Sequence, residues 1–438
     1  MFASSVLRAP LAALCLLLLV AGCDLNIVNP NEPSEEQVLT TTEGIEALAV
    51  GMQEYYATQT LAPVLLTTGT TSREVAVNNT FANLVNLEAG GADLPTNNAN
   101  ILQLWSRNYR VVQMAEDITA ATPDLPFDAG TESGLLSLAD LFKAMALGNI
   151  AQGFEQGPLT TDRENNTTFE PREALFDEAI TRLEDALARL NATPPSDAFL
   201  ATIVAPGIDL RNTLQAYRAR YLLFAGRFGD AIAAAEAVDP DATSTFPFDD
   251  QSPNPVWDNV FLTPNYAPRE DFGSAATDQG DARRDFFLTG DTGGSAVNDL
   301  PVRTLAGFFG SASASIPLYM PGEMDLIRAE ALVQTGNLAD ATAALNAVRT
   351  QAPDDDPLGV GADLDPYDGP LTADALLEAI HQERRAELFL QGVALEDMRR
   401  LGPADPDPTD SFARSRNFYP YPDQERQNNP NTPTDPAI

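Results

Sequence analysis

The stretch that decides the fold is Glu323–Arg349, EMDLIRAEALVQTGNLADATAALNAVR. Two apolar stripes at helical spacing run through it, first at Leu326, Ala329 and Val333, and then at Leu338, Ala341, Leu345 and Val348. Gly336 stands between the stripes and can end the first helix in a left-handed conformation. Asn337 follows and can cap the second helix. The stretch therefore predicts two helices joined by a tight turn.

The same unit occurs earlier in the chain. Ala216–Asp239 lies over Leu326–Arg349 without a gap, and Gly226 coincides with Gly336. Alanines also coincide, but alanine-rich helices match easily. A helix–glycine–turn–helix unit that recurs with this spacing indicates a tetratricopeptide-type repeat. The alternative is two unrelated amphipathic hairpins in an all-α protein.

The rest of the chain predicts an all-α fold, a tetratricopeptide-like scaffold of helix pairs over about residues 135–190, 214–239, 323–349 and 372–401. Residues 240–318 are rich in Asp, Pro, Gly, Ser and Phe and have no sustained period. Irregular chain of this length commonly forms a binding surface or packs as a sub-domain. Residues 65–94 are also expected to be irregular. We expect residues 34–438 to form a single domain.

Composition excludes several classes of function. The 438-residue chain has a net charge of −37, which argues against nucleic acid as a partner. Its cysteines, Cys15 and Cys23, both lie near the N-terminus, so the rest of the chain has no disulfide framework or cysteine metal site. One histidine, His381, excludes a two-histidine zinc site.

The N-terminus has the layout of a secretory signal, with Arg8, an apolar run and then small residues. Val20-Ala21-Gly22-Cys23 resembles the bacterial lipobox, in which the cysteine is lipidated and becomes the new N-terminus. We expect a lipoprotein signal peptide over residues 1–22, lipidation at Cys23, and a polar tether over residues 23–33. An ordinary signal peptide or an uncleaved anchor is the alternative.

Four stretches, taken in order, resemble the SusD/RagB family: the lipobox with CDLNIVNPNEPS, the hairpin LIRAEALVQTGNLADATAALNAVR, HQERRAELFLQGVALEDMRRLG, and NFYPYPDQERQNNP. The family's Arg-Arg-x-Glu-Leu segment and the residues after it are matched by Arg384, Arg385, Glu387, Leu388, Gly392, Asp397, Arg399 and Arg400. Its terminal signature is matched by Pro420, Pro422, Glu425, Asn429 and Pro430. The chain departs from the family at Gln391, where an aromatic residue often precedes the glycine, and it is shorter than many glycan-binding members.

The resemblance implies a function. Members of this family are nutrient-binding lipoproteins of the outer membrane that cover a SusC-like, TonB-dependent β-barrel transporter and deliver an oligosaccharide or a peptide to it. It further implies helix pairs with a more irregular half that carries the ligand site. We therefore expect a lipid-anchored, surface-facing binding protein that is not an enzyme and has no cofactor.

Trp257, with its neighbours Asp258 and Asn259, is the candidate ligand-binding residue because it lies in the irregular segment. Sugar rings stack on aromatic side chains while their hydroxyls bind polar groups. A tryptophan there could equally pack the sub-domain. Trp105 has apolar neighbours on a helix and is expected in the core.

The charged residues of the Arg-Arg-x-Glu segment have two readings. Arg384, Arg385 and Glu387 could clamp a ligand, or they could form a structural ion-pair network between their helix and the tail. The planar guanidinium fork favours the second reading. His381 lies beside them without a serine or cysteine motif, so we do not expect it to be catalytic.

Three other hypotheses remain. Asp363, Asp365 and Asp368 could bind calcium, but the loop lacks the EF-hand glutamate, so no metal site is expected. A surface hydrolase would need a carboxylate pair beside a cleft. A scaffolding lipoprotein without a small ligand would have a closed, packed segment over residues 240–318, whereas convergent polar groups there would support ligand capture.

Overall fold

The computed structural model describes residues 38–438 except 163, 275–277 and 279. The predicted signal peptide, the predicted lipidation site Cys23 and the predicted tether lie outside the described residues. The α-helices are α3 (Thr42–Tyr55), α4 (Thr68–Thr71), α5 (Ala82–Ala89), α6 (Ala99–Ala121), α7 (Ala129–Gly153), α8 (Arg172–Ala192), α9 (Asp197–Thr202), α10 (Leu210–Phe224), α11 (Phe228–Ala235), α12 (Pro255–Trp257), α13 (Arg283–Phe287), α14 (Pro321–Gln334), α15 (Leu338–Arg349), α16 (Ala373–Glu387), α17 (Ala394–Arg400) and α18 (Asp423–Asn428).

Short elements complete the chain. The π-helices are η1 (Tyr56–Thr60), η2 (Pro63–Thr67) and η4 (Asp258–Leu262), and the 3₁₀ turns are η3 (Thr122–Asp124), η5 (Glu270–Gly273), η6 (Gly307–Phe309) and η7 (Pro353–Asp355). The strands are β1 (Val75–Val77), β2 (Gln156–Gly157), β3 (Glu170–Pro171), β4 (Thr245–Phe246), β5 (Tyr266–Pro268), β6 (Leu288–Ser295), β7 (Pro301–Leu305) and β8 (Ile316–Pro317). They form antiparallel pairs β1–β5, β2–β3, β4–β8 and β6–β7.

The predicted all-α fold is confirmed, and the two hairpins read from the sequence are α10–α11 and α14–α15. Gly226 and Gly336 end the first helices at φ 71° and 83°. In both turns the next N–H donates back to a carbonyl five residues earlier, Arg227 to Leu222 and Asn337 to Leu332. The two hairpins therefore end their first helices in the same way, as a repeat requires.

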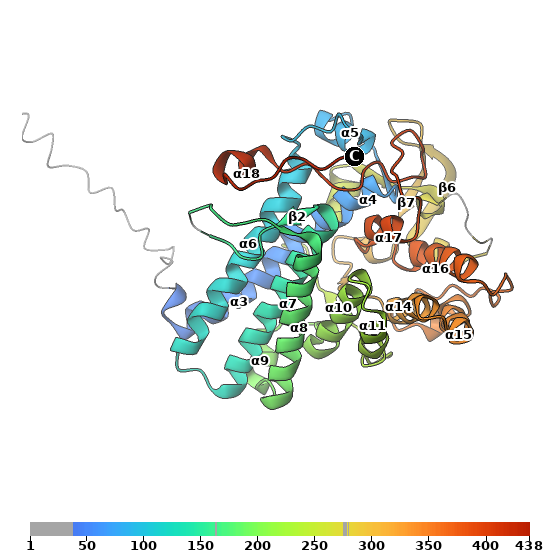
Figure 1. The fold of residues 1–438 in the computed structure, drawn as a ribbon. Coiled ribbons are helices and arrows are strands. Elements are labelled where there is room, and N and C mark those ends of the chain that lie inside the picture. The colour runs from blue at the N-terminus through green and yellow to red at the C-terminus, as the bar shows by residue number, and fades with distance from the viewer. Residues whose placement is uncertain (1–37, 163, 275–277, 279) are drawn as a thin grey trace, which may run out of the picture.

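The helix pairs stack in chain order from α7 and α8 through α10 and α11 to α14, α15 and α16 (Figure 1). Helix α7 is the centre of the main core. It is long and apolar enough to cross a membrane, but 89% of its most apolar stretch is buried inside the protein, so it is a core helix. Gly148 lets α10 approach it, because a Cβ there would lie 2.1 Å from the Tyr221 ring.

The expectation of irregular structure over residues 65–94 is wrong in part. Helix α3 continues through η1, η2 and α4, so helical backbone runs from Thr42 to Thr71, and α5 follows. Threonine hydroxyls donate to carbonyls one turn back, including Thr68 to Val64 and Thr70 to Leu66 at 2.5 and 2.7 Å. These threonines are buried. Burial overrides their weak helix propensity.

Residues 240–318 contain only short helices and strands in their described part, and they are tied to the scaffold at several points. Strand β5 pairs with β1, which places Tyr266 opposite Val77. Arg283 is buried against Glu383 and Glu387 of α16 at 2.5 and 3.2 Å. The irregular segment is thus held directly on the helical scaffold.

The buried Arg220–Glu323 pair joins the two repeated hairpins, with both bidentate contacts at 2.6 Å. We predict that Glu323→Ala lowers the free energy of unfolding in urea by about 3–5 kcal/mol, because it leaves a buried guanidinium unpaired. The double variant Arg220→Leu/Glu323→Leu should recover much of that loss. As a control, Glu184→Ala breaks the partly exposed Arg218–Glu184 pair and should cost less than about 1 kcal/mol. Equal losses for both alanine variants would contradict the prediction.

Candidate functional site

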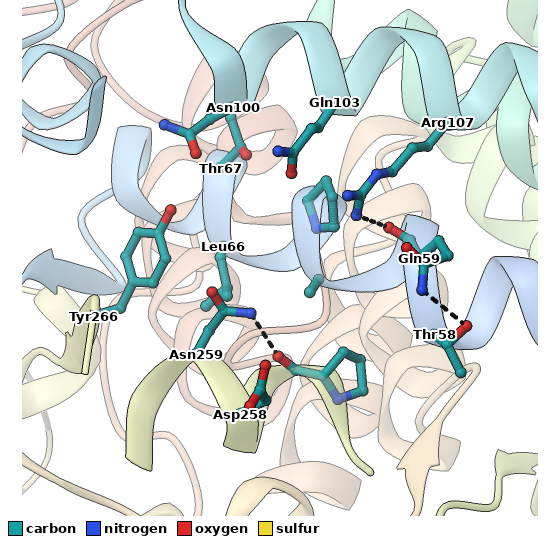
Figure 2. A pocket seen from close by; sticks show the side chains of 13 residues that line it. Thr58, Gln59, Leu66, Thr67, Asn100, Gln103, Arg107, Asp258, Asn259 and Tyr266 are labelled. Carbon is teal, nitrogen blue, oxygen red and sulfur yellow. Dashed lines mark hydrogen bonds between the residues drawn. The ribbon is translucent and has the colours of Figure 1, made fainter. Parts of the chain in front are cut away.

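A cavity of about 320 Å³ lies between α6, the η1–η2 segment and the irregular segment. Its lining is mostly polar: Thr58, Gln59, Ala62, Pro63, Leu66, Thr67, Asn100, Gln103, Arg107, Pro255, Asp258, Asn259 and Tyr266. Figure 2 shows Asn100, Gln103 and Arg107 on one side, with Asp258 and Asn259 facing them from the other. Polar groups from three distant parts of the chain therefore converge on one concave site.

The π-helices of the described chain all border this cavity. η1 contributes Thr58 and Gln59, η2 contributes Leu66 and Thr67, and η4 contributes its first two residues. π-Helical turns are rare in proteins, and those that occur are frequently located at functional sites. Their gathering here marks the cavity as the candidate functional site.

Pro63 explains part of this local geometry. It has no N–H, so the α-helical hydrogen bond to the carbonyl of Gln59 cannot form. The Gln59 carbonyl instead accepts a hydrogen bond from Nη1 of Arg107 at 2.5 Å. This contact holds η1 against α6 and aims the guanidinium at the cavity, as Figure 2 shows.

Helix α6 supplies one wall through Asn100, Gln103 and Arg107, which share a face at i, i+3 and i+7. The Asn98 side chain caps the helix by accepting from the Asn100 N–H at 3.0 Å. Gln103 is exposed, and burial lowers the pKa of the half-buried Arg107 from its usual value. This wall therefore offers two amides and one cation to a ligand.

Asn254 organises the opposite wall. Its side-chain oxygen accepts the N–H groups of Val256 and Trp257, both at 3.0 Å, and its amide donates to Phe308 and Ala314 carbonyls. This cap starts the turn from which Asn259 projects, and the Asn259 amide donates to the Pro255 carbonyl at 2.8 Å. The wall is thus built from the irregular segment itself.

Tyr266 closes one end of the cavity. Its side chain is 4% exposed, and its hydroxyl points inward (Figure 2). Burial raises the pKa of Tyr266 well above its usual value, so the phenol stays protonated and can donate as well as accept.

The structure brings two of the three predicted ligand residues to this cavity. Asp258 and Asn259 line it, whereas Trp257 does not. Trp257 is half-buried and stacks on Phe261, with ring centroids 6.3 Å apart. Phe261 and Leu262 are exposed at 38% and 67%, so an apolar ridge follows directly on the cavity wall.

Sequence reasoning missed the α6 and η1–η2 sides of the cavity. The only available signal was the polar stripe at Asn100, Gln103 and Arg107, and such a stripe usually marks a solvated helix face. Trp105 on the other face of α6 is in the core, as predicted. It is 4% exposed, packs against Phe154 and donates its indole N–H to Glu425 at 3.1 Å.

The Arg-Arg-x-Glu segment lies in a buried ionic network away from this cavity. Arg384 contacts Asp397 at 2.8 Å, and Arg385 donates to the Ser72 and Phe272 carbonyls. Glu387 contacts Arg283, and burial raises the pKa of Glu387 to about 8 although the guanidinium opposes the shift. The network supports a structural role for these residues rather than a ligand clamp. The sequence predicted that it would link the helix to the tail, whereas the contacts above join α16 to α17 and to the irregular segment.

The acidic loop gives no support to calcium. Asp363 has a left-handed backbone, and the Asp365 carbonyl accepts a hydrogen bond from Arg349 at 3.3 Å. Within the described residues, no three acidic, histidine or cysteine side chains gather where they could hold a metal ion.

Residues 309–433 match the model of the SusD family. A SusD superfamily protein from Bacteroides thetaiotaomicron has a similar structure, with a TM-score of 0.71 at 16% identity, covering 91% of this chain and 100% of that chain. A SusD-like carbohydrate binding protein from Bacteroides fragilis is also similar, with a TM-score of 0.69 at 14% identity, covering 90% of this chain and 99% of that chain. Another from Bacteroides vulgatus has a TM-score of 0.64 at 16% identity, covering 82% of this chain and 83% of that chain. No curated protein sequence matches the chain. At identities this low, the structural similarity shows a shared fold. Together with the family match over residues 309–433, it confirms the SusD/RagB resemblance.

His381 gives a test of the buried network. Burial and the nearby Arg385 lower its pKa to about 4, so the imidazole is neutral in the folded protein. We predict that its NMR resonances titrate near pH 4, and the assignment is unambiguous because the chain has one histidine. Because the unfolded chain takes up this proton near pH 6.5, the stabilising contribution of the neutral imidazole is lost as the pH falls from about 6.5 to 4. Titration near pH 6.5 in the folded protein would contradict this.

Proposed function

We propose that the chain is a nutrient-binding protein of the SusD/RagB type that captures an oligosaccharide or a peptide in the cavity between α6 and η4. The observation that carries the proposal is the convergence of amide and hydroxyl groups from α6, η1–η2 and the irregular segment. Ligand sites are concave and place a few polar groups to orient the ligand. A cavity with this lining suits a ligand rich in hydroxyl or amide groups.

Of the two ligand classes, the observations favour an oligosaccharide. Similar proteins from Bacteroides fragilis and Bacteroides vulgatus are named carbohydrate binding proteins. The ridge of Trp257 and Phe261 beside the cavity would receive the apolar face of a sugar ring, which extends the site beyond the cavity itself. Trp257 would then contact the ligand outside the cavity, and Asp258 and Asn259 inside it.

The proposed function is binding without bond cleavage. Among the described residues that line the cavity, Asp258 is the only carboxylate. Glycosidases need two carboxyl groups on either side of the bond that breaks. The lining therefore gives no support to the hydrolase alternative. The convergent polar groups likewise favour ligand capture over a purely scaffolding role.

The proposal extends to the membrane. Lipidation at Cys23 would anchor the protein in the outer membrane with its binding face on the cell surface, beside a TonB-dependent barrel that takes over the ligand. Support comes from the lipobox-like Val20–Cys23 and from the family.

Gln103 gives a direct test of the cavity because it is exposed and projects from the α6 wall. We predict that Gln103→Ala weakens binding to the ligands found on a glycan and peptide array by about two- to tenfold, the value of one neutral hydrogen bond. Calorimetry would measure the change. Gln427→Ala, at an exposed glutamine of α18, is the matched control and should bind normally. Cleavage of a bound ligand would contradict the assignment as a binding protein.

Removal of the lipidation site tests the anchor. Cys23→Ala should release the protein into the soluble fraction and change the mass of its N-terminal peptide, because no acyl chains are attached. A barrel transporter should co-purify with the wild type from gently solubilised membranes. A variant that stays membrane-bound with unaltered mass would rule out the lipobox, and repeated purification without a barrel would count against delivery.

A further inference from the structure

The cavity contains a cation whose charge the surrounding protein does not use. Arg107 forms none of the ion pairs found among the described residues, and its one hydrogen bond goes to the neutral carbonyl of Gln59. A guanidinium has five N–H donors. This contact therefore leaves Nε, Nη2 and the second hydrogen of Nη1 for a ligand.

This guanidinium lies in a strongly acidic chain. Acidic residues outnumber Lys and Arg by 63 to 26, and many of the described arginines, such as Arg220, Arg283 and Arg384, are paired with carboxylates. Burial of Arg107 lowers its pKa, which means that the cation is partly desolvated without a compensating anion. A partly desolvated cation that faces a cavity gains most from an anionic partner supplied by the ligand.

Resting on the proposed function, we propose that the cavity binds a carbohydrate that carries a carboxylate, such as a terminal uronic acid, with the carboxylate on Arg107. A guanidinium matches the two oxygens of a carboxylate with two parallel N–H groups. The net charge of −37 opposes long polyanions, but a single carboxylate can be bound locally by one arginine.

The rest of the lining fits the remainder of such a ligand. Gln103 and Asn100 lie beside Arg107 on the same helix face, and Asp258 and Asn259 occupy the opposite wall (Figure 2). Asp258 would repel a second carboxylate but accepts hydrogen bonds from hydroxyl groups. The ligand is therefore oriented with its acidic end toward α6 and its hydroxyl-bearing end toward η4.

The test compares uronic-acid-terminated disaccharides with neutral counterparts in which the C6 carboxylate is replaced by a hydroxymethyl group. We expect the acidic sugars to bind about ten- to a hundredfold more tightly in calorimetry, the usual range for a hydrogen bond to a charged group. Arg107→Gln should abolish this preference, so that each acidic sugar binds with the same affinity as its neutral counterpart. Arg107→Lys keeps the charge but not the planar fork, and should retain part of the preference.

Arg110 provides the matched control. It lies on the same helix, is exposed and does not line the cavity, so Arg110→Gln removes the same charge from the same neighbourhood. The preference for acidic sugars should survive this change. Equal loss in both variants would reduce the effect to general electrostatics and overturn the proposal.

Two further outcomes separate this inference from the proposed function. Neutral sugars that bind as tightly as acidic ones, in a manner sensitive to Gln103→Ala, would uphold nutrient binding in the cavity and overturn the carboxylate preference. Tripeptides with free and amidated C-termini form the second arm. Binding of only the free-carboxylate tripeptide, without any sugar, would overturn the carbohydrate assignment. Failure of every probe to bind would contradict both the inference and the proposed function.

Discussion

Buried arginines that require partners are the constraint on which the rest of this structure depends. Arg283 is 1% exposed, and its guanidinium contacts Asp281, Glu383 and Glu387. Taking such a charge out of water costs several kcal/mol unless it is paired and hydrogen-bonded. The irregular segment that carries Arg283 is therefore restricted to the one placement on α16 that satisfies these groups. An apolar contact surface would tolerate more sliding than this directional set of bonds.

That placement fixes the cavity, although the ionic network lies away from it. Arg385 donates to the carbonyls of Ser72 and Phe272, which links α16 to the end of the N-terminal helical run and to the irregular segment at once. The β1–β5 pairing then sets Tyr266 opposite Val77. With the irregular segment tied to the scaffold at Tyr266, Phe272 and Arg283, the turn after Asn254 faces α6 at a defined separation. The binding groups can therefore be polar and exposed while their supports are buried.

The sequence predicted what depends on local pattern and missed what depends on distant contacts. The hairpins followed from apolar spacing and from Gly226 and Gly336. Asp258 and Asn259, predicted as ligand residues because they lie in the irregular segment, line the candidate cavity. The helical run through Thr71 was missed, since its threonines are helical only because tertiary packing buries them. Arg107 was missed because a polar helix face looks the same whether it meets water or a cavity. Trp257 lies next to the cavity but does not line it. This position depends on the π-helical turn that follows, which the spacing of apolar residues does not predict.

The π-helical wall has a consequence for how related chains can diverge. Each residue turns an α-helix by about 100°, so a deletion or insertion in a regular helix rotates everything that follows and disrupts the core. A wall built from wide turns, as over Tyr56–Thr67, can absorb one residue more or less by tightening or widening a turn. The side chains that face the cavity then change as a set, while α3 and β1 keep their positions. In this fold, the ligand specificity of the cavity can therefore change through insertion or deletion of a residue in this π-helical wall, as well as through amino-acid substitution.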